Sequence, residues 1–520
     1  MTERKAIGID LGTTFCAVAH IDAYGKPQII PNSESERITP SVILFEGTNA
    51  VVGTLAKNTA VAEPERIVDF VKREMGKSRE QFSREFAGKH YSAEELSALI
   101  LKKLKIDAEK FLKQDVTDAV ITVPAYFNDA ERTATITAGE LAGLKVLQVI
   151  NEPTAAAVAY GLDKLEEDQT VFVFDLGGGT FDVTIMRIAG YRMQMLATNG
   201  DHRLGGKDWD DVIVNYVADE FDREHGENPL IDLQSYQDLQ SRALAAKIQL
   251  STRARTAIVH SYNGKSIKVE LTREEFETRT KHLVENCKTI CELVMSEAKL
   301  EWGQIDKVLL VGGMTRMPMI REMISLLAPV PLATDVSADE AVAVGAAIQA
   351  TLLLLRSEEE NNEVLLPQNT REQFSSRDGS LIEITNITSH TLGVVLWDDE
   401  QNEEYVYPMI TKMSAIPARI KNCFGTAESN MDRAVVRIVE GESTVPAECT
   451  PLGTCAVGLP PHLPKGSLVE LIYEYNDNQV LEVAVQACGK TTQVTIDRTG
   501  GLLPAEVDDA KAKLAAVDVS

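Results

Sequence analysis

Short apolar runs and longer amphipathic stretches alternate through the first two thirds of the chain. Runs rich in β-branched residues, such as AVITV at 119–123 and KVLLVGG at 307–313, predict buried strands. The stretch SAEELSALILKKLKIDAEKFL at 92–112 repeats apolar residues at helical spacing and predicts a long helix. Because strands and helices are mixed along residues 1–355, we expect an α/β domain there.

The pattern changes twice after residue 355. Residues 356–380 are polar, begin with an acidic run and have no periodicity, which predicts a linker or a long surface insertion. Residues 381–500 contain short runs that alternate apolar and polar positions between Pro, Gly and Asn-Asp turns, which predicts a separate, mostly β domain. Residues 501–520 have helical composition and room for a short C-terminal helix or tail.

Composition and charge limit the partners of the protein. The chain has 520 residues, 44% of them hydrophobic and 25% charged, which is typical of a globular protein with roughly three to four domain-sized units. Its formal net charge of -26 argues against nucleic acid as a partner, because tracking a phosphate backbone needs a basic face. An anion would instead be bound by local backbone N–H groups, a metal ion and a few lysines.

Cysteine usage and hydropathy point to a reducing compartment. Seven cysteines are scattered without a C-x-x-C pair, so we expect structural thiols and a cytoplasmic protein. The chain starts with MTERKAIGIDL, which has no secretory apolar region, and we expect no membrane-spanning stretch.

One glycine-containing motif occurs twice. GIDLGTT at 8–14 matches FDLGGGT at 174–180 almost position for position, and an apolar run follows each copy. Each copy is therefore predicted to be a β-hairpin. A dinucleotide-binding glycine turn leads into a helix, so the direction of the chain excludes that reading, and the sequence has no P-loop.

Two such hairpins could hold one polyphosphate from both sides, since glycine lets backbone N–H groups approach phosphate oxygens closely. Asp10 and Asp175 end the first strands of the two hairpins, and carboxylates suit the Mg²⁺ that accompanies a triphosphate. The alternative is that both motifs are tight turns with solvent-facing acids. A third glycine motif, LLVGGMTRMP at 309–318, could support a base or ribose, and DEAVAVGAAIQA at 339–350 places an acid at a helix start.

These residues resemble the 70-kilodalton heat-shock chaperone family, of the bacterial DnaK type. The order and spacing of the matching motifs cover nearly all of residues 5–350. The motifs are IGIDLGTT (7–14), VPAYFNDAERTAT (123–135), INEPTAAAVAYG (150–161), DLGGGTFDV (175–183), LGGKDWD (204–210), LVGGMTRMP (310–318) and ADEAVAVGAA (338–347). The resemblance implies an α/β, actin-like (ribonuclease H-like), two-lobed ATPase domain over 1–355, followed by a peptide-binding-like β-sandwich over 381–500.

The resemblance also assigns roles to individual residues. It implies that Asp10 and Asp175 hold Mg²⁺, and that Lys72, Glu152, Asp175, Thr180 and Asp182 form the catalytic set. The phosphates would be bound by Gly12, Thr13, Thr14, Gly177, Gly178 and Gly179. The nucleoside would be bound by Gly205, Gly206, Lys247, Ser251, Gly312, Gly313, Arg316 and Asp339. Pro124, Tyr126 and Arg132 match positions that relay nucleotide state toward the linker.

Several positions depart from the family pattern. Lys207 and Leu244 stand where acids are usual beside the nucleoside, so adenosine affinity or nucleotide exchange could differ. In the segment LIEITNITSHTLG at 381–393, which aligns with the family linker, Glu383 interrupts the apolar run and Asn386 replaces an acid. Ala434 stands where a larger aliphatic residue lines the peptide pocket, and residues 502–520 leave no room for the helical lid.

We therefore expect an ATP-dependent molecular chaperone that hydrolyses ATP to ADP and phosphate and binds extended segments of unfolded polypeptides. A J-domain co-chaperone and a nucleotide-exchange factor are further expected partners, and neither nucleic acid nor membrane is. The degenerate linker, Ala434 and the short tail leave open a nucleotide-dependent scaffold or regulator without a peptide-binding cycle. A sugar kinase or a filament-forming actin relative would share the hairpin clamp, but NEPTAAAVAYG and the β domain argue against both.

Overall fold

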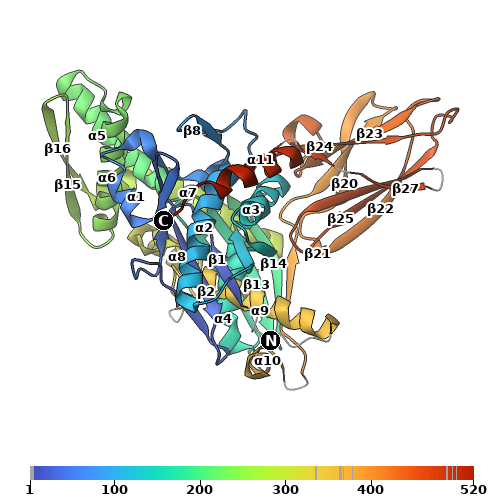
Figure 1. Cartoon of the computed structure of the whole chain (residues 1–520), viewed down its shortest axis with the longest axis horizontal. Helices are drawn as coiled ribbons and strands as arrows, with labels where there is room; N and C mark the ends of the chain where they lie inside the picture. The colour runs from blue at the N-terminus through green and yellow to red at the C-terminus, as the bar shows by residue number, and fades with distance from the viewer. Residues whose placement is uncertain are drawn as a thin grey trace.

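Two α/β lobes and a β-sandwich make up the fold (Figure 1). The computed structural model describes residues 5–165, 167–333, 337–361, 366, 368–376, 379–487, 490–494, 496–498 and 500–520. Lobe I is built around the sheet that contains the first strand of the chain, and lobe II around the sheet that contains the second glycine hairpin. The β-sandwich lies against one flank of the two lobes (Figure 1).

The central sheet of lobe I has the strand order β11-β10-β1-β2-β3, with β4 paired to β2. Strands β1 and β2 form the expected antiparallel hairpin, whereas β10 and β11 run parallel to β1. The strands are β1 Ala6–Asp10, β2 Phe15–Ile21, β3 Pro27–Ile30, β4 Thr39–Pro40, β10 Asp118–Val123 and β11 Lys145–Asn151. Helices α2 (Ala93–Leu112) and α3 (Asp129–Leu141) pack against each other beside this sheet.

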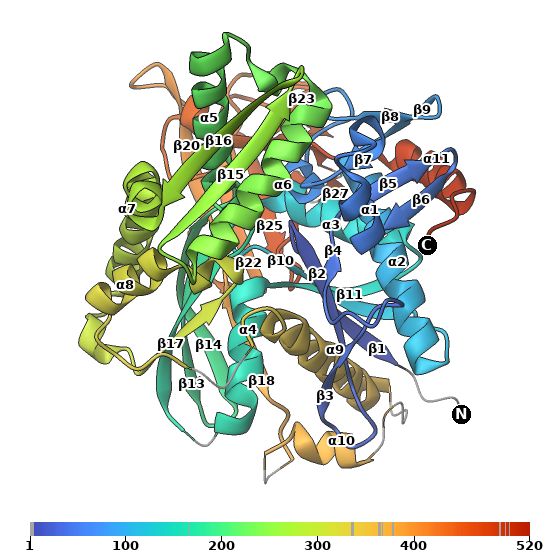
Figure 2. The ribbon, with the colours of Figure 1, turned by 90° about the vertical axis from the view of Figure 1, so that its left-hand side faces the viewer.

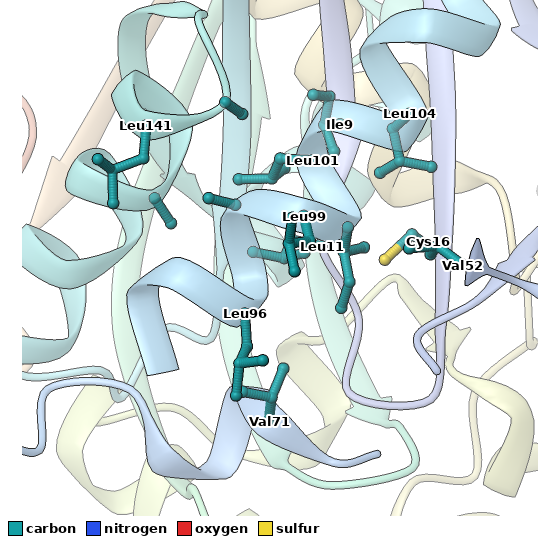
Figure 3. Packing of buried hydrophobic residues seen from close by; sticks show 14 of the residues in the cluster. Ile9, Leu11, Cys16, Val52, Val71, Leu96, Leu99, Leu101, Leu104 and Leu141 are labelled. Carbon is teal, nitrogen blue, oxygen red and sulfur yellow. The ribbon is translucent and has the colours of Figure 1, made fainter. Parts of the chain in front are cut away.

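The expected helix at 92–112 begins at a complete capping box. Ser92 is the N-cap and accepts a hydrogen bond from the Glu95 N–H, while the Glu95 carboxylate accepts one from the Ser92 N–H. The apolar face of α2 then fills the core of lobe I. Figure 3 shows Leu96, Leu99, Leu101 and Leu104 of this helix among core residues from β1, β2 and neighbouring segments.

Lobe II contains the second hairpin in the sheet order β17-β12-β13-β14-β18-β21. Strands β12 and β13 pair antiparallel, with Asp175 opposite Asp182 in the register, so the second glycine motif is also a hairpin turn. The strands are β12 Gln169–Leu176, β13 Phe181–Ala189, β14 Arg192–Asp201, β17 Lys307–Val311, β18 Glu383–Ile387 and β21 Ala415–Ile416. The motif at 309–318 runs from β17 into α8 (Pro318–Leu327), as the sequence predicts.

Helices α4 (Glu152–Gly161) and α9 (Ala341–Asn361) cross between the two lobes at very close range. An ideal Cβ on Gly345 of α9 would lie 1.7 Å from the Ala155 carbonyl oxygen of α4, and one on Gly8 of β1 would lie 2.0 Å from the Ala347 nitrogen. Glycine is therefore required at both crossings.

Helix α9 is long and apolar enough to span a membrane by length and composition, so the expectation that no such stretch exists is wrong in that narrow sense. Its mean hydropathy over the best window is 1.3, but 78% of that window is buried inside the protein. The apolar residues of α9 pack on β1, β2 and α4, and the helix therefore has the character of a core helix of the fold.

A smaller subdomain rises from each lobe (Figure 2). In lobe II it consists of α5 Gly206–His225, α6 Leu233–Leu250, the hairpin β15 Arg255–Tyr262 with β16 Lys265–Thr272, and α7 Arg273–Ala298. In lobe I it consists of α1 Thr54–Thr59 and the sheet of β5 Ile43–Glu46, β6 Asn49–Val52 and β7 Ile67–Val68, with β8 Arg84–Phe86 and β9 Lys89–Tyr91 nearby. Figure 2 shows these subdomains on opposite sides of the molecule above α9.

The expected β domain is a two-sheet sandwich. One sheet has the order β20-β19-β23-β24-β28 and the other β22-β25-β26-β27, and the buried residues of both form one core. The strands are β19 Leu392–Asp398, β20 Glu403–Ile410, β22 Ala418–Gly425, β23 Arg433–Glu440, β24 Thr450–Gly458, β25 Leu468–Tyr475, β26 Leu481–Ala487, β27 Lys490–Val494 and β28 Asp497–Arg498. Val436 belongs to this core and the partly buried Ala434 packs against it, whereas Val406 packs with Val439 and Cys449 in a separate cluster.

The segment that aligns with the family linker is a strand of lobe II. Strand β18 (Glu383–Ile387) pairs parallel with β14, and Ile382 and Ile387 are buried among residues of the two lobes. Of the polar segment 356–380, residues 356–361 complete α9 and Gln368–Gln373 form α10. Residues 362–365, 367 and 377–378 of that segment lie outside the described residues.

The C-terminal segment, residues 500–520, returns to lobe I. Helix α11 (Pro504–Ala515) packs on α2 and α3, and Ala510 and Leu514 are buried in the core of lobe I. Beyond the helix the chain follows the edge strand β6, where the Ala50 N–H donates to the Asp518 carbonyl at 2.9 Å. The β-sandwich is thus joined to lobe II at its start and to lobe I at its end.

Cysteines do not cross-link the described residues. Cys16, Cys287, Cys291, Cys449 and Cys455 are buried free thiols and Cys423 is an exposed one, as expected of structural thiols. Cys488 lies outside the described residues.

Candidate functional site

A deep cavity of about 610 Å³ lies between the two lobes and is lined by both glycine hairpins. Most of the residues expected to bind nucleotide line it. They are Asp10, Gly12, Thr13, Thr14, Lys72, Glu152, Asp175, Gly177, Gly178, Thr180, Gly206, Lys247, Ser251, Gly312, Gly313, Arg316 and Asp339. Gly179, Asp182 and Gly205 lie outside the lining: Gly179 and Gly205 face each other closely, and Asp182 is buried behind the second hairpin.

The two hairpin turns touch each other across the cavity. An ideal Cβ on Gly178 would lie 2.4 Å from the Thr14 hydroxyl, and one on Gly179 would lie 2.4 Å from the Thr13 hydroxyl. Any side chain at either glycine would force the turns apart, so the bare backbone lets both hairpins present their amides to one ligand. Two motifs far apart in the sequence therefore form one site.

Four carboxylates and one lysine form a cluster at the base of the cavity, in which Asp10 is half-buried and the other four groups are buried. Asp10, Asp175 and Asp182 stand at the ends of β1, β12 and the start of β13, and Glu152 begins α4. Lys72 donates a hydrogen bond to Glu152 and forms a buried ion pair with it. With all five groups ionised, the charge of this cluster is negative, which suits a divalent cation.

Burial and mutual repulsion raise the pKa values of the three aspartates in the cluster. Burial, aided by the negative charge of Glu152, raises the pKa of Asp10 to about 7 and the pKa of Asp182 to about 8. The same two causes raise the pKa of Asp175. Burial alone would lower the pKa of Lys72, but Glu152 and Asp10 outweigh it and the net shift is upward, so this lysine stays charged.

Whether Mg²⁺ fits can be judged from the chemistry of these groups. Asp10 and Asp175 face the cavity with hard oxygen ligands and raised pKa values, which a cation would relieve. Over the part of the chain that is described, no group of three or more Asp, Glu, His or Cys side chains is placed to coordinate an ion together. The donor set therefore fits an ion that keeps most of its waters and phosphate ligands.

The other end of the cavity has the polar groups expected around a nucleoside. Lys247 donates to the Gly206 carbonyl at 2.7 Å and to Asp210 at 2.8 Å. Arg316 pairs with Asp339 at 2.5 Å, and both residues line the cavity. Leu244 also lines the cavity. Lys207, which replaces a usual acid, forms an ion pair with Asp211 at 2.6 Å in the first turns of α5.

The three residues expected to relay nucleotide state lie where the β-sandwich meets lobe I. The fully buried Arg132 donates to the Phe127 and Ala125 carbonyls, at 2.9 and 3.0 Å. The Ala125 carbonyl also accepts a hydrogen bond from Ser389. The Tyr126 ring contacts His390 edge to face with 4.1 Å between ring centroids, and the Tyr126 N–H donates to Asp182 at 3.1 Å. One short segment, residues 124–126, thus touches both the carboxylate cluster and the connection between β18 and the first strand of the β-sandwich, β19.

The sequence did not single out two residues that the structure places at the site. Asp210 holds Lys247 from the wall of the cavity. Arg73 bridges from the Lys72 segment to the second hairpin and to Asp208. Arg73 directly follows Lys72 and Asp210 ends the LGGKDWD motif, so their position beside candidate residues was the available signal.

Comparisons with known proteins agree with the motifs. A family model described as "Hsp70 protein" matches residues 6–87 and 78–518. The chain is 39% identical to the chaperone protein DnaK of Thermotoga neapolitana over 512 residues, which are 96% of this chain and 81% of that protein. It is 38% identical over the same shares to the DnaK of Thermotoga maritima, and 39% identical to that of Thermosipho africanus over 93% of this chain and 78% of the relative.

Proposed function

Because this chain belongs to the Hsp70 family and is an ATP-hydrolysing molecular chaperone, we propose how its residues bind and hydrolyse ATP. The single observation that carries the proposal is the contact between the two glycine hairpins above the Lys72 and Glu152 pair. Like the family, it binds ATP or ADP and unfolded polypeptide clients. We infer a cytoplasmic location from the same relatives.

The phosphates lie between the two hairpin turns. Gly12, Thr13 and Thr14 supply amides and hydroxyls from lobe I, and Gly177, Gly178 and Gly179 supply backbone from lobe II. The close packing of Gly178 on Thr14 supports this arrangement, because it leaves main-chain groups of both lobes facing the same space. Phosphate binding therefore involves both lobes at once.

Asp10 and Asp175 would hold Mg²⁺. When bound, the ion neutralises charge on the phosphates and orients them for in-line attack. The raised pKa values of both carboxylates support this role, since each gains from a nearby cation. Because the two carboxylates stand on opposite lobes, both lobes would contribute to cation binding.

Hydrolysis needs a water held in line with the γ-phosphate, and we assign that task to Lys72, Glu152, Asp182 and Thr180. Lys72 remains protonated and directs its charge toward the developing charge on the phosphate, while Glu152 orients the lysine. Asp182, buried behind the second hairpin, helps to position the water, and only its ionised form, with a pKa raised to about 8, can accept a proton. These residues contribute positioning and charge, which is the main requirement of phosphoryl transfer.

The nucleoside lies on the glycine pairs at the far end of the cavity. Lys247, Ser251, Gly312, Gly313, Arg316 and Asp339 line this part of the cavity. Gly205 is the N-cap of α5 and Gly206 is its first residue, so both lie next to the second hairpin turn. Leu244 contributes an apolar contact at this end in place of an acid.

The β-sandwich, whose strands run from Leu392 to Arg498, binds extended polypeptides, and its affinity follows the nucleotide in 1–355. Support comes from residues 124–126, which contact Asp182 on one side and the first residues after β18 on the other. A J-domain co-chaperone and a nucleotide-exchange factor are the expected regulatory partners of this cycle.

Two experiments test the proposal. ATP turnover is measured for Asp10→Asn, Asp175→Asn and Lys72→Ala, and each variant is expected to lose most of its activity. Unchanged turnover in all three would disprove the catalytic assignment.

The second experiment measures peptide affinity with ATP and with ADP. Weaker peptide binding with ATP is expected, whereas no ATP-sensitive release from a peptide array would favour a nucleotide-dependent scaffold.

A further inference from the structure

Arg73 crosses the cleft directly beside the catalytic lysine. It belongs to the short 3-10 segment Val71–Glu74, whose Lys72 side chain points to Glu152. The Arg73 guanidinium points instead to lobe II, where Nε and Nη2 donate to the Gly179 carbonyl at 3.1 and 2.8 Å. Nη2 also pairs with the Asp208 carboxylate at 2.6 Å, and Nη1 donates to that carboxylate at 3.3 Å.

The receiving side is a tightly connected piece of lobe II. The Asp208 carboxylate that binds Arg73 also accepts the Gly205 N–H at 2.7 Å. From the same turn, the Gly206 N–H donates to the Gly177 carbonyl at 2.9 Å and the Lys207 N–H to the Gly178 carbonyl at 2.8 Å. Arg73 and the start of α5 therefore fix three successive carbonyl groups of the second hairpin turn.

Fixing those carbonyls fixes the amides that face the phosphates. A trans peptide is planar, so the Gly179 carbonyl and the Thr180 N–H point in opposite directions. With the carbonyl held by two N–H donors of Arg73, the Thr180 N–H is turned away from the arginine. Three consecutive glycines have little conformational preference of their own, and an external constraint is needed to keep the turn in one conformation.

The base of Arg73 is held as firmly as its tip. Val71 is buried against Leu96 of α2, as Figure 3 shows, and Met75 accepts a hydrogen bond at its sulfur from Ser97. The ion pair itself is largely shielded, with 15% of the Arg73 side chain and 25% of the Asp208 side chain exposed. A shielded bidentate pair between rigid supports can set the distance between two loops.

We infer that Arg73 is a positioning residue for ATP hydrolysis, which holds the Gly177–Thr180 turn against Lys72 without touching the nucleotide. Neither Arg73 nor Asp208 lines the nucleotide cavity. The inference rests on the proposed function, because the turn and Lys72 must act on the same phosphate. Arg73 therefore affects the rate at which bound ATP is hydrolysed.

The test is single-turnover ATP hydrolysis and ATP affinity in Arg73→Ala, Arg73→Lys and wild type. Arg73→Ala is expected to lower the hydrolysis rate at saturating ATP about 10- to 100-fold, the range for loss of a supporting hydrogen-bond partner. The ATP affinity is expected to fall by a smaller factor. Arg73→Lys should recover part of the rate, because lysine restores one charged donor but not the two-pronged contact.

The matched control is Arg187→Ala. Arg187 forms the same kind of two-pronged pair with Asp168, at 3.0 and 2.8 Å, on the exposed ends of lobe II strands far from the cleft. Its loss should change neither rate nor affinity. A rate for Arg73→Ala within twofold of wild type at saturating ATP, or a loss confined to ATP affinity, would overturn the inference.

Two further variants keep the outcome unambiguous. Lys72→Ala separates the proposed catalytic mechanism from the inference about Arg73. If Lys72→Ala abolishes turnover while Arg73→Ala leaves turnover unchanged, only the inference about Arg73 is wrong.

If Arg73→Ala does not fold, Asp208→Asn replaces it as the test, because asparagine keeps an acceptor for the Gly205 N–H and removes the charge that holds Arg73. A lowered single-turnover rate supports the inference, and an unchanged rate overturns it.

Discussion

Asp182→Asn should stabilise the nucleotide-free protein at alkaline pH while it impairs hydrolysis. The side chain is buried, and its carboxylate accepts one hydrogen bond, from the Tyr126 N–H at 3.1 Å. Asparagine has the same shape and can accept the same bond, so the substitution removes charge and little else. A buried charge lowers the stability of the folded protein, and proteins keep such a charge where their function depends on it.

The size of the effect follows from the pKa of Asp182. Burial raises that pKa from 3.8 in the unfolded chain to about 8 in the folded protein. Between these values the folded state holds a proton that the unfolded state has lost, so the contribution of Asp182 to stability is full below pH 3.8 and falls as the pH rises through about 8. Each pH unit in this window costs about 1.4 kcal/mol, which amounts to about 4 kcal/mol between pH 5 and pH 8.

Urea denaturation of wild type and Asp182→Asn at pH 5 and pH 8 measures this difference. Asparagine does not titrate, so the free energy of unfolding of the variant relative to wild type should rise by about 2 to 4 kcal/mol from pH 5 to pH 8. Trp209 is fully buried in lobe II, so tryptophan fluorescence can follow the unfolding of that lobe. If the two proteins show the same pH dependence, the carboxylate is not the buried, titrating group described above.

Three other features give separate predictions. Gly345→Ala should lower the free energy of unfolding by roughly 3 kcal/mol or more in thermal melts, because the new Cβ would lie 1.7 Å from the Ala155 carbonyl oxygen. The control in the same melts is Gly303→Ala, whose new Cβ would have no atom within 4 Å. Leu514→Ala should cost about 2 to 5 kcal/mol and speed limited proteolysis of residues 502–520, unlike the exposed Lys511→Ala; equal cleavage of both would contradict the buried position of the tail. Removal of Mg²⁺ with EDTA should abolish ATP turnover until Mg²⁺ is restored, and turnover that survives chelation would disprove the assignment of the aspartate pair.

Local sequence patterns were enough to predict the elements that carry the site. The two glycine hairpins follow from an apolar run on both sides of a side-chain-free turn, and α2 follows from helical periodicity behind the Ser92 capping box. These features depend on residues within one element, where short-range preferences decide the structure. The assignment of Lys72, Glu152 and the nucleoside residues came from the family resemblance instead, since no local pattern indicates that residues 72 and 152 form a pair.

Contacts between distant elements could not be predicted in this way. The Arg73 side chain looks like any cation of an exposed turn until lobe II supplies the Gly179 carbonyl and Asp208. The polarity of Glu383 and Asn386 suggested a defective linker, yet β18 lies in the lobe II sheet because its backbone pairs with β14 whatever its side chains are. Residues 500–520 read as a short helix, and their place on lobe I depends on an apolar surface formed by other segments.

The chain connections at the two ends of the β-sandwich, together with the hydrogen bonds of its residues 477–481 to lobe I, constrain how it can move. Its N-terminal end is a strand of the lobe II sheet through β18, and its C-terminal end is fastened to lobe I through α11 and the contact of residue 518 with Ala50. A rotation that opens the nucleotide cleft moves these two anchoring sites relative to each other. The sandwich must then shift with one lobe and strain or release its contact with the other. Because Arg73 and Asp208 join the same two lobes beside the cavity, we expect cleft closure and the position of the β-sandwich to be linked.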